Sequence, residues 1–258
     1  MAIDCVNVRP GIEVASLTDV GRQRANNEDS FAYWEPQSEE EFQRRGRLAV
    51  IADGMGGYEG GQEASRIAVQ TVVEWYSESS GEDAQAVLIE AFAEAHRRIR
   101  EYAEEHLELH GMGTTCTAVA VIGRQIFFAH VGDSRLYLVH GDSLTRLTRD
   151  HSYVGRLVES GIVRSEDAEK HPQRHILTSA LGSGRDVIPD KAERIVRLET
   201  GDSLLLCTDG LWSQVTEQEI TSSLQKKSAA EACALLVNLA LQRGGPDNIT
   251  VQVLRVSR

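Results

Sequence analysis

The stretch that decides the fold is Ala49-Val50-Ile51-Ala52-Asp53-Gly54-Met55-Gly56-Gly57-Tyr58-Glu59-Gly60-Gly61. It begins with an apolar run of the length of a buried strand, which we expect to end at Asp53, and a helical pattern follows from near Gln62. The glycines between them allow positive φ or a close approach of the backbone to a ligand. Aspartate and glycine are also ordinary turn residues, so this segment alone fits a structural turn as well as a binding site. The choice depends on aspartates elsewhere in the chain.

The composition is that of a globular protein with a sizeable core. Of the 258 residues, 41% are hydrophobic and 26% are charged, which excludes a disordered chain. No linker tract or internal repeat is present, so we expect one domain over residues 1–258, with a core of about 14–256. The first residues lack a signal-peptide pattern, and no apolar run is long enough to span a bilayer. We therefore expect a cytoplasmic protein, and we expect it to be a monomer.

The net charge limits the classes of partner that the chain can bind. A formal net charge of −12 argues against nucleic acid or an anionic membrane as the main partner, because both need a basic face. The excess of carboxylates suits a divalent cation, although a solvated acidic surface is the simpler explanation of the charge alone. The cysteines have no paired spacing, so we expect buried free thiols rather than disulfides or a zinc site. They are Cys5, Cys116, Cys207 and Cys233.

The spacing of apolar residues predicts strands and helices in separate blocks. Strands are expected at 14–19, 30–34, 48–52, 204–208 and 249–256, with an antiparallel meander over 114–147. Helices are expected near 62–76, 84–102, 152–160 and 231–241, with others starting near 165 and 216. This order favours an α+β fold with antiparallel sheets over a doubly wound fold.

Two polar segments and three aromatic residues complete this prediction. Residues 35–46 are expected to form an exposed excursion. Residues 150–190 have little apolar periodicity and are expected to form a small mobile excursion, for which a surface insertion without function is the competing interpretation. Trp75, Tyr76 and Tyr102 are expected to pack in the core.

Four predicted strand boundaries share one design, an aspartate with a glycine close by. They are Asp53-Gly54, Gly132-Asp133, Asp209-Gly210 and Pro246-Asp247. Strand ends can meet at one edge of a sandwich, where clustered carboxylates raise one another's pKa unless cations lie between them. A cluster of oxygen ligands selects Mg²⁺ or Mn²⁺. The pattern therefore predicts a divalent metal site.

Six motifs occur in an order that identifies a family. They are Arg24 through Asp29, Asp53-Gly54-Met55-Gly56-Gly57, Gly113-Thr114-Thr115, Val131-Gly132-Asp133-Ser134-Arg135, Thr208-Asp209-Gly210-Leu211 and Asp247-Asn248-Ile249-Thr250. Together they resemble the motifs of the metal-dependent protein serine/threonine phosphatases of the type 2C family, and the compact chain looks like the bacterial members. The resemblance spans about Val14 to Val256. It implies a four-layer α-β-β-α sandwich of two antiparallel sheets flanked by helix pairs, with residues 150–190 as a flap beside the active site.

The resemblance also implies the ligands of the metals, two Mn²⁺ or Mg²⁺ ions in the core site and a third, weaker one. The residue matching Asp53 bridges the two core ions, and the carbonyl matching Gly54 binds one of them. Asp209 and Asp247 match the acids that complete this site. Asp133 matches a ligand of the third ion, which Asp209 shares.

Other residues act on water and phosphate in this resemblance. Glu28 matches an acid that reaches the metals through water, with Asp29 and Asn248 in support, and Arg24 matches the arginine that holds the substrate phosphate. Two cations lower the pKa of a shared water, while an arginine fork neutralises phosphoryl charge. Some relatives carry a histidine at the place of Met55, which is proposed to protonate the leaving oxygen, so the general acid stays open here. Neither His151 nor His175 lies in a motif that makes it a replacement, and we expect both to be structural or on the excursion.

The implied activity is metal-dependent hydrolysis of phosphoserine and phosphothreonine in proteins, opposing bacterial serine/threonine kinases. The partners would be phosphorylated proteins, among them such kinases and their substrates. Basic residues of the flap could meet acidic phosphoprotein surfaces, although a solvated charged face explains them as well; they are Arg156, Arg164, Lys170, Arg174 and Arg185. The alternative function is a catalytically weak module that senses a phosphoprotein or nucleotide on the same fold. A cysteine-based phosphatase and a P-loop kinase are disfavoured because the chain lacks their phosphate-binding loops.

Overall fold

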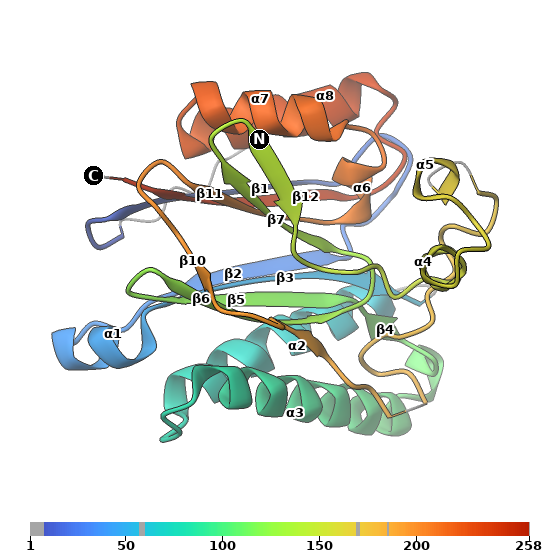
Figure 1. Ribbon diagram of the computed structural model, residues 1–258. Helices are drawn as coiled ribbons and strands as arrows, with labels where there is room; N and C mark the ends of the chain where they lie inside the picture. Colours follow the sequence, from blue (N-terminus) through green and yellow to red (C-terminus); the bar gives the residue numbers. More distant parts are fainter. Residues whose placement is uncertain (1–7, 57–59, 169–170, 185, 258) are drawn as a thin grey trace.

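Two antiparallel sheets pack face to face in the computed structural model, which describes residues 8–56, 60–168, 171–184 and 186–257. One sheet has the order β1 (Ile12–Asp19), β12 (Ile249–Val256), β11 (Ser203–Cys207), β7 (Arg135–His140) and β8 (Ser143–Arg146). The other has the order β10 (Val196–Arg197), β6 (Gln125–Val131), β5 (Cys116–Ile122), β3 (Arg47–Met55) and β2 (Asp29–Trp34). The short strands β4 (Gly113–Thr114) and β9 (Asp190–Lys191) pair with β3 and β6. Figure 1 shows the two sheets as the inner layers.

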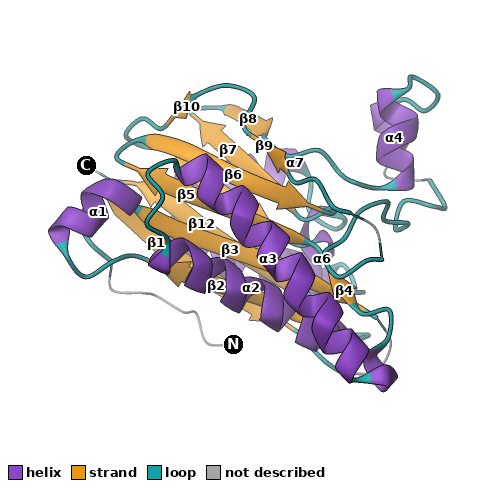
Figure 2. Ribbon diagram, turned by 90° about the horizontal axis from the view of Figure 1, so that it is seen from below, coloured by secondary structure: helices purple, strands orange, loops and turns teal. Residues whose placement is uncertain are grey.

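Helix pairs form the outer layers. α2 (Gly60–Glu78) and α3 (Ala84–Glu105) cover the outer face of the sheet that contains β3, and both run across it in Figure 2. α7 (Glu217–Lys226) and α8 (Ala229–Gln242) cover the other sheet (Figure 1). The predicted four-layer α-β-β-α sandwich is confirmed. Each helix of the described residues is too short or too polar to cross a bilayer.

Three buried clusters hold the layers together: one between the sheets, and one under each helix pair. Leu136, Leu204 and Ile51 belong to the cluster between the sheets. Burying one such side chain contributes roughly 1.5–3 kcal/mol, so these layers supply the main stabilisation of the fold. The expectation for Trp75 is wrong, because its residue is 36% exposed, whereas Tyr76 on the next position of α2 is only 1% exposed.

Local signals set the helix starts. Thr216 and Glu219 form a capping box at the start of α7, and Ser228 and Glu231 form another at α8. Asp83 caps α3 by accepting hydrogen bonds from the first amides of that helix. Each start lies within a few residues of its predicted position. Cys116 and Cys207 are buried free thiols, as expected. Cys233 is also buried, and Cys5 lies outside the described residues.

The polar segment 35–46 is largely exposed, as predicted, but it also contains the helix α1 (Glu39–Arg45) and a buried arginine. Ser38 caps this helix. Arg45 Nη1 donates to the carbonyl of Tyr76 at 2.9 Å, and the Tyr76 hydroxyl donates to the carbonyl of Arg45 at 2.9 Å. Composition alone hid this anchor because an arginine normally indicates exposure.

The predicted meander is wrong at its centre. β6 and β7 are consecutive in the chain but belong to different sheets, so the chain crosses the sandwich between Val131 and Arg135. Gly132 makes this crossing with φ +108°, and a Cβ there would lie 2.5 Å from the Thr115 side chain. A connection this short normally indicates a hairpin. The crossing places Asp133 at the end of both sheets.

Other elements of the chain are short. They are the 3-10 helix η1 (Leu107–Leu109) and the helices α4 (Tyr153–Glu159), α5 (Ser165–Ala168) and α6 (Asp209–Trp212). α4 and α5 belong to the flap, which stands beside one end of the sandwich in Figure 1. Ser152 caps α4, and Gly161 follows the helix with φ +69°.

Candidate active site

Several strands end near α6 at one end of the sandwich (Figure 1). A cavity of about 590 Å³ lies there, and acidic side chains line it. The predicted acids Glu28, Asp53, Asp133, Asp209 and Asp247 all face this carboxylate cavity. They come from five separate parts of the chain. The fold therefore brings the strand-end aspartates together at one edge.

Asp53 lies inside its strand and not at its end, because β3 continues two residues further, to Met55. Its amide donates to Thr115 Oγ1 at 2.9 Å, and its carbonyl accepts from Thr114 Oγ1 at 2.8 Å and from the Thr115 amide at 2.9 Å. The backbone is thus held on both sides, which fixes the direction of the carboxylate. Burial, followed by repulsion from Asp29 and other aspartates, raises the pKa of Asp53 well above its ordinary value.

Glycines allow the start of α2 to approach this strand. A Cβ on Gly54 would lie 2.0 Å from the carbonyl oxygen of Gly61, and a Cβ on Gly61 would lie 2.1 Å from Glu28 Oε2. A larger residue at either place would have to push the backbone or Glu28 aside. The glycine motif therefore serves close packing of three elements, and its members Gly57, Tyr58 and Glu59 lie outside the described residues.

Asn248 holds the loop that carries Glu28. Its Oδ1 accepts from the Glu28 amide at 2.8 Å, and its Nδ2 donates to the carbonyls of Val20 and Asn26, both at 2.9 Å. Burial raises the pKa of the Glu28 carboxyl, which Arg24 opposes. The hydrogen bonds of the Asn248 side chain thus hold the loop between β1 and β2 against the start of β12.

Asp29 lies behind Asp53, since these residues pair across β2 and β3. Its Oδ2 accepts hydrogen bonds from Thr208 Oγ1 at 2.9 Å and from Thr250 Oγ1 at 2.6 Å. Its Oδ1 is buried and has no hydrogen-bond partner among the residues that the structure describes. Burial raises the pKa of Asp29 to about 7 despite the two threonine hydrogen bonds. A buried oxygen of this kind needs a positive charge or a donor nearby.

Arg24 reaches the cavity from the loop before β2. Its Nη2 lies 2.7 Å from Asp247 Oδ2, and the side chains are 54% and 30% exposed. This pair is exposed, so it contributes little to stability, and the guanidinium can leave Asp247 for another anion at small cost. Asp209 is the first residue of α6.

The donor set fits divalent metal ions. The acids offer only oxygen ligands, and burial with mutual repulsion raises the pKa of Asp133 as well as that of Asp53. Cations between them would relieve this repulsion, and hard cations prefer such ligands. In the described part of the chain, no group of three His, Cys, Asp or Glu side chains is already closed around one point. The carboxylates thus share a cavity into which ions would draw them.

The flap brings three further residues to the cavity, the basic Arg174 and His175 and the apolar Leu177. His175 Nδ1 lies 3.8 Å from Asp209 Oδ2, and its side chain is 55% exposed. The sequence pattern did not indicate that His175 approaches Asp209, because the flap has no apolar periodicity that would show which of its residues face the cavity. The only feature of the sequence that pointed to this contact was the pair of adjacent basic residues, Arg174 and His175. His151 lies elsewhere and accepts a hydrogen bond from the Gly132 amide at 3.3 Å, which agrees with a structural role. Met55 lines the cavity where some relatives carry histidine.

The remaining basic residues of the flap lie elsewhere. Arg156 lines a different hollow, and Arg164 pairs with Asp167 at 2.8 Å. Lys170 and Arg185 lie outside the described residues. Among these residues, only Arg174 faces the carboxylate cavity within the described ranges.

A sandwich of two antiparallel sheets, with helix pairs outside and an acid-lined cavity at one end, defines the class of metal-dependent protein phosphatases. The family model described as Protein phosphatase 2C matches residues 21–239, and the chain belongs to this family.

Similar proteins agree. The chain is 38% identical over 245 residues to "Serine/threonine protein phosphatase PstP" of Mycobacterium tuberculosis, covering 95% of this chain and 45% of that protein. It thus spans less than half the length of that relative. It is also 38% identical over 239 residues to "Serine/threonine phosphatase stp" of Listeria welshimeri, covering 91% of this chain and 92% of the relative. A crystal structure of the catalytic domain of PstP in complex with two manganese ions has a TM-score of 0.82 and 34% identity, covering 96% of this chain and 99% of that one.

Proposed function

We propose that the chain is a metal-dependent phosphoprotein phosphatase that hydrolyses phosphoserine and phosphothreonine. The observation that carries this proposal is the convergence of Asp53, Asp209 and Asp247 on one cavity that Arg24 enters. Acids alone would repel a phosphate dianion, so the cavity suits phosphate only when cations accompany it. Relatives named serine/threonine phosphatases support the choice of substrate.

Asp53, Asp209 and Asp247, with the Gly54 carbonyl, would hold two Mn²⁺ or Mg²⁺ ions, and Asp133 with Asp209 would hold a third. When bound, these ions would lower the pKa of an attacking water and neutralise charge on the phosphoryl group. The manganese ions of the PstP structure support this assignment.

The side chains of this chain position the reactants. Arg24 would leave Asp247 and orient the substrate phosphate with its planar fork, which matches two phosphate oxygens. Glu28, held by Asn248 and by the packing of Gly61, would orient water at the metal centre. Asp29 would support Asp53 from behind through the strand pairing. Met55 supplies no proton, so a water would protonate the leaving oxygen.

The physiological setting belongs to the same proposal. The partners would be phosphorylated proteins, including serine/threonine kinases of a bacterial signalling system and their substrates. We propose that the chain acts as a cytoplasmic monomer and as one domain, with the flap of residues 150–190 as a part of it.

The test is phosphate release from phosphoserine and phosphothreonine peptides. We expect turnover with Mn²⁺, none with excess EDTA, and recovery when Mn²⁺ is restored. The double variant Asp53→Ala with Asp209→Ala should be inactive in saturating Mn²⁺. Turnover that survives EDTA or the double substitution would contradict the proposal, and stoichiometric peptide binding without turnover would favour a sensing module.

A further inference from the structure

The two sheets end side by side along one edge of the sandwich. There β8 is the last strand of its sheet, and β9 and β10 both pair with β6 at the edge of the other sheet. A hollow of about 350 Å³ opens between these edges. Phe128, Leu147 and Val196 form its apolar wall.

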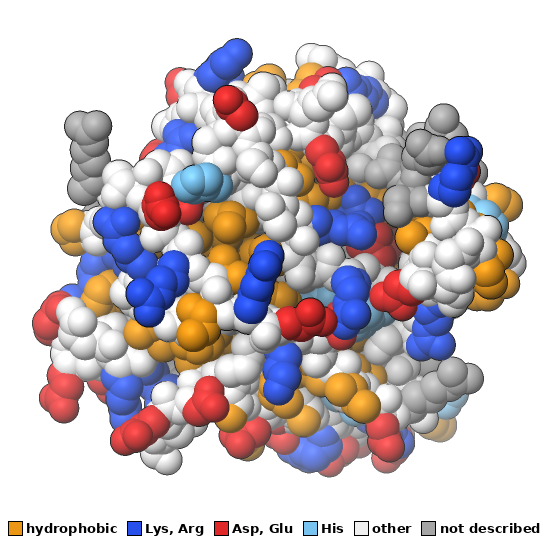
Figure 3. Space-filling view, in the orientation of Figure 1, with side chains coloured by type: hydrophobic (Ala, Val, Ile, Leu, Met, Phe, Trp, Pro, Cys, Tyr) orange, Lys and Arg blue, Asp and Glu red, His pale blue; other side chains and the backbone are white. Residues whose placement is uncertain are grey.

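Four exposed cations surround this hollow, and we call them the basic seam. They are Arg146, Arg149, Lys191 and Arg194. Asp190 and Glu193 are the acids among the described lining residues. Asp190 pairs with Arg149 at 3.0 Å, and Asp150, outside this lining, pairs with Arg146 at 3.2 Å. No carboxylate of the described residues lies within ion-pair distance of Lys191 or Arg194. This is a local excess of positive charge on a chain with a net charge of −12. Figure 3 shows basic side chains around exposed apolar surface on the face where β10 lies in Figure 1.

The backbone at this edge is open to an extended peptide. β9 and β10 have two residues each, and the chain leaves the sheet between them at 192–195. Ile195 in this interruption is 67% exposed. Edge strands present unpaired N–H and C=O groups that can pair with another chain. The seam therefore combines apolar contact, short edge strands and positive charge.

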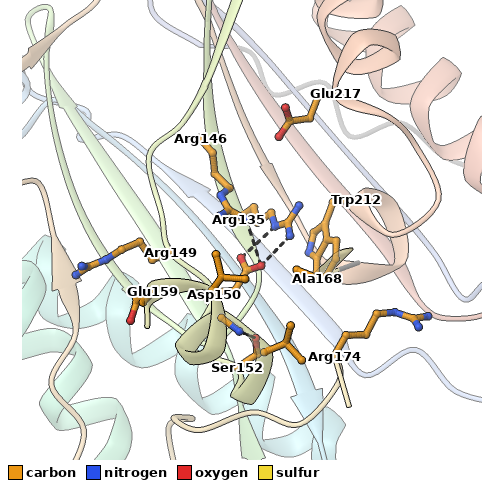
Figure 4. A pocket seen from close by; sticks show the side chains of 13 residues that line it. Arg135, Arg146, Arg149, Asp150, Ser152, Glu159, Ala168, Arg174, Trp212 and Glu217 are labelled. Carbon is orange, nitrogen blue, oxygen red and sulfur yellow. Dashed lines mark hydrogen bonds and ion pairs between the residues drawn. The ribbon is translucent and has the colours of Figure 1, made fainter. Parts of the chain in front are cut away.

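The seam connects to the carboxylate cavity through a second hollow, of about 440 Å³, under α4 (Figure 4). Its floor is the Arg135–Asp150 ion pair, with Trp212 beside the arginine. This hollow shares Arg146 and Arg149 with the seam and shares Arg174 with the carboxylate cavity. The three hollows are therefore neighbours on one side of the molecule.

We propose that the basic seam binds an acidic, extended segment of the phosphoprotein substrate, remote from the phosphorylated residue. This inference rests on the proposed function. The seam favours carboxylate-rich segments because its cations outnumber the acids that line it. Binding along the seam raises the effective concentration of the phosphorylated residue at the cavity.

The experiment compares two phosphothreonine peptides that differ only in a distant block, which is Glu-rich in one and Gln-rich in the other. The variant is Lys191→Glu with Arg194→Glu. The matched control is Arg44→Glu with Lys226→Glu, which makes the same charge change at exposed positions on α1 and α7. p-Nitrophenyl phosphate, which cannot reach the seam, reports the integrity of the cavity.

For the wild-type chain we expect a kcat/KM about fivefold higher on the Glu-rich peptide than on the Gln-rich one, from a few exposed charge pairs. The seam variant should lose this preference, and the control variant should keep it. Turnover of p-nitrophenyl phosphate should be the same in all three proteins. Raising the salt concentration should reduce the preference, since exposed charges are screened.

A binding measurement separates the seam from catalysis. Fluorescence anisotropy of the unphosphorylated Glu-rich peptide should show binding to the wild type and to the control variant, and weaker binding to the seam variant. Equal binding to all three proteins, or binding of a single-stranded oligonucleotide in preference to the peptide, would overturn the proposal that the seam binds an acidic peptide segment. Failure to hydrolyse p-nitrophenyl phosphate with peptide binding intact would count against the proposed function and leave the seam standing.

Discussion

The carboxylate cavity and the basic seam are opposites in charge, in burial and in construction. Strand pairing and backbone hydrogen bonds hold Asp53 in place, whereas the cations of the seam stand on edge strands and loops. Holding like charges close together in the cavity costs free energy, and the packing of the sheets offsets this cost. The seam has exposed charges that cost little to maintain. The proposed catalytic site thus lies on the rigid part of the fold, and the proposed site of peptide recognition lies at the edge of the sheets.

The largest expected effect is at Asp53. Asp53→Asn should lower kcat/KM on phosphopeptides by at least about a thousandfold, since the amide cannot bridge two cations. The melting temperature of the metal-free variant should not fall, because the substitution removes a buried carboxylate whose charge neighbouring acids oppose. Kinetics and differential scanning calorimetry in EDTA check both results. Loss of activity together with a lower metal-free melting temperature would mean that Asp53 acts mainly in folding.

Gly61 tests the packing around the cavity. Gly61→Ala places a Cβ 2.1 Å from Glu28 Oε2 and should destabilise the protein by about 1–3 kcal/mol. The matched control is Gly184→Ala, because a Cβ there meets nothing within 4 Å. Urea denaturation gives both free energies of unfolding. Equal stability of the two variants would show that Glu28 moves aside freely.

Arg24 tests the phosphate contact. Arg24→Ala should lower kcat/KM about tenfold by removing a charged hydrogen bond to the phosphoryl group. Arg22→Ala, a neighbouring arginine outside the lining of the cavity, is the control and should change kcat/KM by less than about twofold. Product-inhibition constants for inorganic phosphate should follow the same order. Unchanged kinetics in Arg24→Ala would remove this residue from the substrate site.

The smallest effect is on the pH dependence of stability without metal. The pKa of Asp29 rises to about 7 in the folded chain, from about 3.9 when unfolded. Between these values the folded state binds more protons than the unfolded state, so stability falls as the pH rises from about 4 to about 7. Melting temperatures in EDTA should therefore decrease across this window. Asp29→Asn should flatten the slope, and saturating Mn²⁺ should reverse it; a flat profile in the metal-free wild type would contradict the raised pKa.

The sequence predicted the α+β sandwich and most element positions because apolar spacing reports burial directly. β12 occurs at its predicted bounds. The helices α7 and α4 begin within one residue of their predicted starts, where Thr216 and Ser152 cap them. The β6–β7 crossing was not predictable, since a short turn of glycine and aspartate is also the signal of a hairpin. Arg45 was missed because its burial depends on Tyr76, which is distant in the chain.

The residues of the candidate site were also predictable in part. Asp53, Asp133, Asp209 and Asp247 were identifiable because each occupies a strand boundary near glycine, and the structure brings all four to one cavity. The approach of His175 to Asp209 was not, because the direction of the flap follows from tertiary contacts. The seam was hidden for a related reason: Arg146 and Arg194 are far apart in sequence and meet only where two sheet edges meet.

The most direct measurement is the number of Mn²⁺ ions bound per chain at equilibrium, by dialysis and elemental analysis, in the wild type and in Asp53→Asn. If Asp53 bridges the core site, the wild type binds at least two ions with high affinity, and the variant loses both. A wild-type chain that binds none, or an Asp53→Asn chain that retains the full number, would contradict the assignment of the carboxylate cavity as a metal centre.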